Sequence, residues 1–181
     1  LNGNPNLLEL LWLPKEFKVV TTWYWDELLK YRDGFLSKRL IQAYHGYIKG
    51  QMTRMDNAKD KLPREGRNPK RADLEAKFGY DTKHASHVLR LCIQGTQLTL
   101  HQSMNVGLQH EDKLLCLDVK LGKYSYDQFK QLADEKIAKF REAEAVTKLP
   151  DTPDYNTINR CVTDLVFNHL CMVRSCNYDP K

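Results

Sequence analysis

The sequence lacks the signals that would place the chain in a membrane or direct it out of the cell. Its 181 residues contain no uninterrupted apolar run approaching the roughly 18 residues that a membrane-spanning helix needs. A basic stretch followed by an apolar one, as in a secretory signal peptide, is also missing. The five cysteines include no CxxC pair, which argues against a zinc site of the finger type. We therefore expect a cytoplasmic protein with reduced thiols and no membrane partner.

Common catalytic motifs are missing as well. The sequence has no GxxxxGK[ST], GxGxxG, GxSxG or HExxH motif. No Gly-Ser pair precedes two closely spaced aspartates, the arrangement that holds two magnesium ions for nucleotidyl transfer. The only D-x-[DE] triplet, Asp73-Leu74-Glu75, has no glycine-rich partner. We predict no catalytic residue and no cofactor in this chain. The first residue is Leu1 rather than methionine, so we expect a further segment upstream.

Charge is unevenly distributed. The formal net charge is +5, and the segment from Lys49 to Arg90 alone, with eleven basic and six acidic residues, accounts for all of it. Such a local positive field attracts phosphate-bearing partners, either nucleotides or nucleic acid, in a salt-dependent way. The alternative is a solvated loop whose charges serve only solubility. The densest part, which we call the basic cluster, contains Lys59, Lys61, Arg64, Arg67, Lys70 and Arg71.

Helical periodicity runs through most of the chain. Apolar residues recur at three- and four-residue spacings, and Pro and Gly separate the periodic stretches. Only 17–25, rich in β-branched and aromatic residues, favours a short strand or extended piece. We predict an all-α, or nearly all-α, multi-helix bundle. The predicted helices cover 5–13, 26–31, 37–60, 69–78, 82 onward, 111–121, 125–146 and 155–174.

Two glycines, Gly46 and Gly50, fall inside the first long predicted helix. Glycine in a helix interior costs stability, so the pair suggests that a neighbouring backbone or a ligand approaches closely there. The same helix begins near Ser37-Lys38. The ammonium group of Lys38 faces either solvent or a phosphate.

The most distinctive local feature is the block from Gly79 to Arg90. It begins with Tyr80, a candidate stacking ring or hydroxyl, and Asp81 or Thr82 is expected to cap a helix. On that helix several cationic or imidazole groups line one stripe near its start, which makes a plausible phosphate clamp. The residues of this stripe are Lys83, His84, His87 and Arg90.

The two histidines of this block have two other interpretations. A zinc site using His84 and His87 needs at least one further ligand, and two histidines three residues apart are weak evidence for it. Alternatively, both rings are satisfied polar groups between packed helices. Near the start of the chain, Asn6 and Glu9 follow a possible cap, where Glu9 is positioned to accept hydrogen bonds from the first helical turn.

Several sequence pieces follow one another in an order that is typical of a known family. They are Asn4-Pro5-Asn6-Leu7-Leu8-Glu9-Leu10-Leu11, Phe35-Leu36-Ser37-Lys38, Gly46-Tyr47 with Gly50-Gln51, Gly79-Tyr80-Asp81-Thr82-Lys83-His84-Ala85-Ser86-His87 with Arg90-Leu91, and Leu149-Pro150 with Pro153-Asp154. On these pieces, the chain resembles the C-terminal part of the predicted nucleotidyltransferase family of the DNA polymerase beta superfamily, found in bacteria and large phages. The Gly-Tyr-Asp-Thr-Lys-His-Ala block is the most specific of them.

The resemblance implies a helical half of a nucleotidyltransferase without its α/β catalytic half, which would lie in cis or in trans. It implies that Lys83, His84, His87 and Arg90 face a nucleotide or phosphorylated substrate, that Lys38 assists, and that Asn6 and Glu9 lie near the junction with the catalytic half. Mg²⁺ is expected only with that missing half. We divide the single helical domain into a junction (1–34), a core (35–174) and a tail (175–181). The alternative function is a basic, non-catalytic module for nucleic acid or an acidic protein.

Overall fold

The structure of the chain is a computed structural model that describes residues 5–58 and 69–177. Within these ranges the chain is helical and contains no β-strand, so the predicted all-α fold is confirmed. The elements are α1 (Pro5–Glu9), the 3-10 turns η1 (Leu10–Trp12) and η2 (Lys15–Phe17), α2 (Trp23–Leu29), the 3-10 turn η3 (Arg32–Phe35), α3 (Lys38–Ala58), α4 (Pro69–Phe78), α5 (Thr82–His101), α6 (His110–Lys120), α7 (Tyr126–Ala145) and α8 (Tyr155–Asn177).

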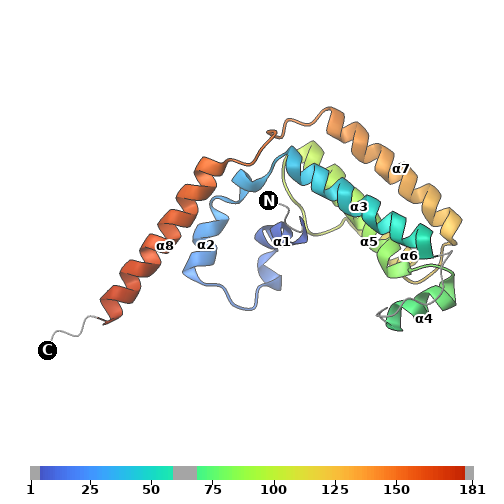
Figure 1. The fold of residues 1–181 in the computed structure, drawn as a ribbon, viewed down its shortest axis with the longest axis horizontal. Helices are drawn as coiled ribbons and strands as arrows, with labels where there is room; N and C mark the ends of the chain where they lie inside the picture. Colours follow the sequence, from blue (N-terminus) through green and yellow to red (C-terminus); the bar gives the residue numbers. More distant parts are fainter. Residues whose placement is uncertain (1–4, 59–68, 178–181) are drawn as a thin grey trace.

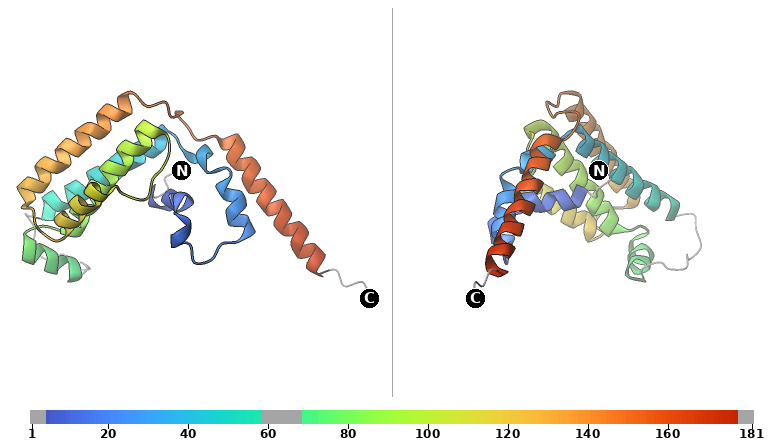
Figure 2. Two further views of the ribbon diagram at one scale, coloured as in Figure 1. Left: turned by 180° about the vertical axis from the view of Figure 1, so that it is seen from behind. Right: turned by 60° about the vertical axis from the view of Figure 1, so that its left-hand side comes forward.

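The helices form two arms that meet at an apex (Figure 1). One arm is a bundle of α3, α5, α6 and α7, with α4 at its far end, and the other arm is α8 lying beside α2. The left-hand view in Figure 2 also shows α8 beside α2 and away from α7. Helix α1 lies between the arms and contacts α3. The N-terminal segment therefore packs against the bundle.

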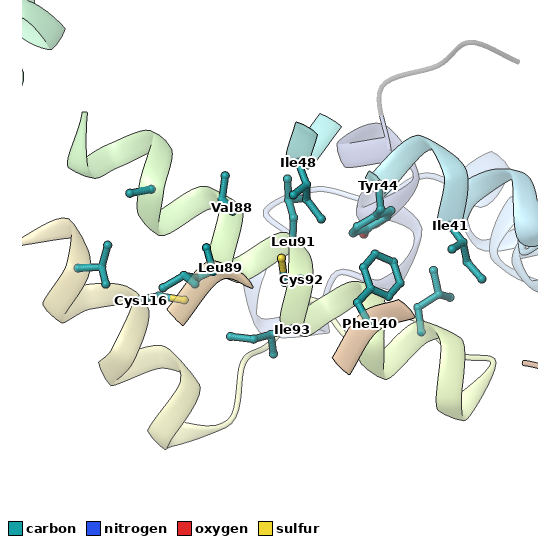
Figure 3. Close-up of a cluster of buried hydrophobic side chains, with 14 of the residues drawn as sticks. Ile41, Tyr44, Ile48, Val88, Leu89, Leu91, Cys92, Ile93, Cys116 and Phe140 are labelled. Atoms are coloured by element: carbon teal, nitrogen blue, oxygen red, sulfur yellow. The ribbon is translucent and has the colours of Figure 1, made fainter. Parts of the chain in front are cut away.

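Helix α5 is the centre of the bundle because it is apolar around most of its circumference. It packs against α3, α6 and α7, and Leu91 and Cys92 are among its fully buried side chains. Figure 3 shows them near Tyr44 from α3 and Phe140 from α7. Burial raises the pKa of the Cys92 thiol to about 12, so this cysteine stays protonated and acts as an apolar core residue.

The close approach between helices occurs at a glycine other than those singled out in the sequence. A Cβ atom on Gly95 of α5 would lie 2.5 Å from the ring of Phe140, and Phe140 itself is fully buried and stacks on His45. By contrast, a Cβ on Gly46 or Gly50 would meet no described atom within 4 Å. The expectation of a close neighbouring backbone at Gly46 and Gly50 was therefore wrong, since both lie on the exposed side of α3.

The apex is held by contacts between η3, the start of α3 and the segment before α8. The amide of Asp154 donates to the carbonyl of Gly34 at 2.9 Å, and the amide of Lys38 donates to the carbonyl of Pro150 at 2.8 Å. The division at 34/35 between junction and core falls within η3, and α8 continues through residues 175–177. Residues from both the junction and the core segments thus build the apex.

The second arm differs from the bundle in how little of it is buried. Tyr24 of α2 contacts His169 of α8, with 2.8 Å between the hydroxyl and Nδ1. Much of the remaining apolar surface of α8 is exposed, including Phe167 and Leu170. For 17–25 the sequence predicted a short strand or an extended piece, and the strand was wrong: 18–22 is an irregular segment. Helix α2 begins at Trp23, three residues before the predicted start at 26.

Two helices end at glycines that separate periodic stretches of the sequence, as predicted. Gly79 after α4 and Gly122 after α6 have φ values of +79° and +75°, a region in which glycine carries no Cβ penalty. Ser125 caps α7 through a capping box with Gln128. Of the helices that the structure describes, none combines the length and the apolarity that would be needed to cross a bilayer.

Candidate functional site

The first turn of α5 is built around a buried carboxylate. Asp81 is the N-cap, and its side chain accepts a hydrogen bond from the backbone amide of His84 at 2.9 Å. Its second oxygen lies 3.0 Å from His84 Nδ1. Of the two caps considered in the sequence, Asp81 is therefore the one used. The carboxylate suits the positive end of the helix dipole, and it also orients the His84 ring.

Tyr80 belongs to the core. It is 2% exposed, its hydroxyl donates to the carbonyl of Tyr124 at 2.9 Å, and its ring stacks on Phe129. Burial raises the pKa of its hydroxyl. Both the ring and the hydroxyl are thus already engaged within the protein.

Lys83 has the opposite environment. It lies on the first turn of α5, it is exposed, and it has no hydrogen bond or ion pair within the part of the chain that the structure describes. Its neighbour one turn further, His87, is half-buried and packs edge-to-face against Tyr47 of α3. Lys83 and His87 therefore form the outer edge of the stripe predicted from the sequence.

The protonation of His87 follows from its contact with Arg90. Arg90 Nη2 lies 3.2 Å from His87 Nδ1, and a guanidinium can only donate, so Nδ1 has to accept and the ring proton has to sit on Nε2. Burial, then Arg90 and His84, lowers the pKa of His87 to about 4. At neutral pH His87 is therefore a neutral donor rather than a cation.

Arg90 is held by a polar network that connects α5 to the start of the chain. Its Nη1 donates to Glu9 Oε2 at 2.8 Å and to Gln94 Oε1 at 2.9 Å. The other oxygen of Glu9 accepts from the Tyr44 hydroxyl at 3.2 Å. Glu9 and Tyr44 are both buried, and burial raises the pKa of Tyr44. The charge of Arg90 is thus compensated inside the protein.

Gln94 completes this network and was missed from the sequence. It is 2% exposed, and besides accepting from Arg90 it donates to the carbonyls of Asn105 and Val106, each at 3.3 Å. A signal was present, since Gln94 lies one helical turn after Arg90, where side chains on a helix meet. The contact between Arg90 and Glu9, which lies 81 residues before it, carried no such local signal.

Lys38 lies apart from the stripe. Contacts between Tyr47 and His87, together with the network joining Tyr44 to Arg90, show that α3 and α5 run antiparallel (Figure 1). Lys38 is in the first turn of α3 and thus at the apex, about 20 Å from the start of α5 by helical rise. There it forms an exposed ion pair of 2.8 Å with Asp151.

The remaining predicted residues are described incompletely. Asn6 lies within α1, and Lys70 and Arg71 fall in the first turn of α4. The other four residues of the basic cluster, Lys59, Lys61, Arg64 and Arg67, lie outside the described residues. Among the described side chains no group of three or more His, Cys, Asp or Glu residues could hold a metal ion. The described residues therefore do not fit a magnesium or zinc centre.

Comparison with known families shows which family the chain belongs to. The family model described as the RNA repair pathway DNA polymerase beta family matches residues 1–164. The chain belongs to this family. The resemblance to a nucleotidyltransferase-like protein of the DNA polymerase beta superfamily is thereby confirmed. No curated protein and no solved structure is significantly similar to the chain. The match includes α1, the polar network and the whole of α5, and ends within α8.

Proposed function

We propose that this chain is the part of a nucleotidyltransferase-like protein that binds the nucleotide or the phosphorylated substrate, and that it does not perform the transfer by itself. Membership of an RNA repair pathway family supports a substrate of this kind, such as a nucleoside triphosphate or an RNA end bearing a phosphate. The carboxylates that would hold Mg²⁺ are missing from the sequence. We assign them to a catalytic half in cis or in trans.

One observation carries the proposal, namely the isolation of Lys83. Each of the other charged or imidazole residues of its block has an internal partner: Asp81 with His84, and Arg90 with His87 and Glu9. Folding therefore explains why those residues are present. Lys83 makes no hydrogen bond or ion pair with the described residues, although it lies beside them in the first turn of α5. A partner from outside the described chain is its best explanation.

The geometry gives Lys83 and His87 complementary roles. The ammonium group of Lys83 supplies the positive charge, which attracts a phosphate as a point charge. His87, one turn further, offers the N–H on Nε2 as a neutral donor, because Arg90 occupies Nδ1. Arg90 is a positioning residue that fixes the ring, and Glu9 in turn fixes Arg90. The same proposal places the protein in the cytoplasm, where nucleotides and RNA are found.

Calorimetry tests this function directly. ATP, CTP, GTP, UTP and a 5′- or 3′-phosphorylated RNA oligonucleotide are titrated into the protein with and without Mg²⁺. We expect binding of at least one of them, and we expect Lys83→Ala to weaken it about tenfold or more, equivalent to roughly 1.4 kcal/mol. Lys139→Ala, which removes an exposed lysine from α7, is the matched control and should leave the affinity unchanged.

The outcomes separate the two functions considered for the chain. If no compound binds, or if Lys83→Ala and Lys139→Ala behave alike, the role of Lys83 is wrong. If RNA binds equally well to Lys83→Ala but is lost, with a steep salt dependence, when basic-cluster residues such as Arg64 and Arg67 are neutralised, the chain is a basic nucleic-acid-binding module instead.

A further inference from the structure

Helix α3 contains a positive charge that the fold does not use. Arg54 lies near the C-terminal end of α3 and is exposed. Within the part of the chain that the structure describes, its guanidinium has no hydrogen bond, ion pair or ring contact. By contrast, Arg39 in the first turn of the same helix donates to the hydroxyl of Tyr155 at 3.0 Å. Arg54 is therefore, like Lys83, a cation whose presence folding does not explain.

The register between α3 and α5 places Arg54 at nearly the same height as Lys83. Tyr47 packs against His87, and the two helices run antiparallel (Figure 1). From this contact, Arg54 lies seven residues further along α3, whereas Lys83 lies four residues back along α5. At a rise of about 1.5 Å per residue, the two positions differ by only about 4–5 Å along the helix pair.

Both side chains also project from the same side of the helix pair. Residues four or seven apart lie on one face of a helix, so Arg54 shares the face of Tyr47, and Lys83 shares that of His87. The axes of packed helices are about 8–10 Å apart, a gap over which the long side chains of arginine and lysine can contact one ligand. The two cations therefore converge from neighbouring helices.

No acidic side chain on these two helices compensates the two charges. Helix α5 contains no Asp or Glu, and Asp56 is the only acidic residue in α3. Asp56 accepts a hydrogen bond from the hydroxyl of Tyr126 and lies 3.6 Å from the ammonium group of Lys130. Both of these partners belong to α7, so Asp56 is directed towards α7. The positive charge near the first turn of α5 thus remains available to an anion.

A buried amide next to the two cations also lacks a partner. Gln51 lies one turn after Tyr47 and three residues before Arg54. It is 3% exposed, and its Oε1 has no hydrogen-bond partner. Buried polar side chains are nearly always hydrogen-bonded, because an unpaired one costs stability. Gln51 therefore marks the same part of α3 as a place where a polar partner is missing.

We propose that Arg54 is a second phosphate-binding residue of the site that contains Lys83, and that the two cations hold linked phosphates of one ligand. This inference rests on the function proposed above. The planar guanidinium binds phosphate oxygens through two parallel hydrogen bonds, whereas the ammonium group acts as a point charge. Two such groups fit a di- or triphosphate better than a single phosphate, because each further phosphate adds negative charge that Lys83 alone leaves uncompensated. Arg54 thereby selects ligands by their number of phosphates.

Calorimetry with ligands that differ only in phosphate number tests the inference. The mono-, di- and triphosphates of the nucleoside that binds best, and RNA ends bearing one or three 5′ phosphates, are titrated without Mg²⁺. The monophosphate is measured by competition where its own heat is small. We expect the parent protein to prefer linked phosphates at least about tenfold, and Arg54→Ala to abolish most of that preference.

Two controls separate selection by Arg54 from general effects of charge and folding. Arg141→Ala removes an exposed arginine from α7 and changes the net charge equally, so it should keep the preference of the parent. Because Arg54 has no described partner, Arg54→Ala should also keep the thermal midpoint of the parent protein. The nucleotide and RNA series together show whether the linked phosphates belong to a free nucleotide or to an RNA end.

The outcomes distinguish this inference from the proposed function. The inference is overturned, and the proposed function stands, if Lys83→Ala weakens binding but the parent shows no preference for linked phosphates. The same holds if Arg54→Ala keeps the full preference, or if Arg141→Ala reduces it as much as Arg54→Ala does. If no compound binds, or if Lys83→Ala has no effect, the proposed function fails and the inference fails with it.

Discussion

At the scale of single residues, the chemistry of the candidate site depends on which atoms are already in use. Arg90 is positively charged in the sequence, but its charge is compensated by Glu9. His87 is an ionisable side chain, but burial, together with the neighbouring Arg90, lowers its pKa so that it is neutral. Lys83 is the residue of the stripe whose charge has no described internal partner. A stripe of four basic residues in the sequence thus becomes one available cation beside a neutral donor.

The depressed pKa of His87 predicts a pH dependence of stability. The unfolded ring takes up a proton near pH 6.5, whereas the folded ring does so only near pH 4. Above pH 6.5 both forms are neutral and the residue has no effect, but as the pH falls from 6.5 to 4 only the unfolded state gains a proton, so folding becomes less favourable. We expect about 1–2 kcal/mol of loss after allowing for solvent screening of a half-buried ring.

Urea unfolding of the parent protein and of His87→Gln between pH 4.5 and 7 measures this effect. The glutamine carbonyl can still accept from Arg90 but does not titrate, so the variant should lose less stability on acidification. His101→Gln removes an exposed histidine from the last turn of the same helix and should follow the parent. Identical pH profiles for the parent and His87→Gln would refute the assignment.

At the scale of elements, the crossing of α5 and α7 depends on a missing side chain. The Phe140 ring occupies the space that a Cβ on Gly95 would need. Replacing Gly95 with alanine gains about 1 kcal/mol of helix propensity but forces a buried aromatic ring to move, and overpacking of this kind costs typically about 1–3 kcal/mol. We expect Gly95→Ala to be destabilising.

Gly46→Ala is the matched comparison because it makes the same change in a helix interior where a Cβ meets no described atom within 4 Å. There only the propensity gain remains, and we expect stabilisation by about 0.5–1 kcal/mol. Urea unfolding midpoints of the two variants should therefore shift in opposite directions. If both midpoints rise instead, the helix crossing tolerates a methyl group at Gly95.

At the scale of the whole molecule, the N-terminal segment is attached to the bundle by the Glu9 network. Glu9→Ala would leave the partly buried Arg90 and the buried hydroxyl of Tyr44 without this acceptor. Losing one member of such a pair costs typically about 2–4 kcal/mol. We expect a loss of this order in urea unfolding.

The ion pair between Lys38 and Asp151 at the apex is the control. The Asp151 side chain is 84% exposed and the Lys38 side chain 44% exposed. Because ion pairs at such a surface contribute little to stability, Asp151→Ala should hardly change the free energy of unfolding. If Asp151→Ala is as destabilising as Glu9→Ala, the attachment of the N-terminal segment does not depend on burial of the Glu9 carboxylate.

Much of the fold was predictable because its signals are local. Three such features are the end of α4 at Gly79, the Asp81 cap of α5 and the start of α7 after Ser125. Each is encoded within one or two helical turns, where residue spacing and capping chemistry decide where a helix begins and ends. The prediction failed at 17–25 for a related reason. Local preference there favours a strand, but a strand needs a hydrogen-bonded neighbour, which the described residues do not provide.

The sequence by itself determined most of the long helices, several of their ends, the presence of Lys83, His84, His87 and Arg90 on one helix, and the absence of a Gly-Ser motif with paired aspartates. Only the tertiary structure decided which cations remain available, because charge compensation between Glu9 and Arg90 joins residues 81 positions apart. The tertiary structure also decided the position of Lys38, because the antiparallel packing of α3 and α5 places it at the opposite end of the helix pair from Lys83. Spacing along the chain fixes local geometry, whereas the partner of a charged group depends on which distant segments pack together.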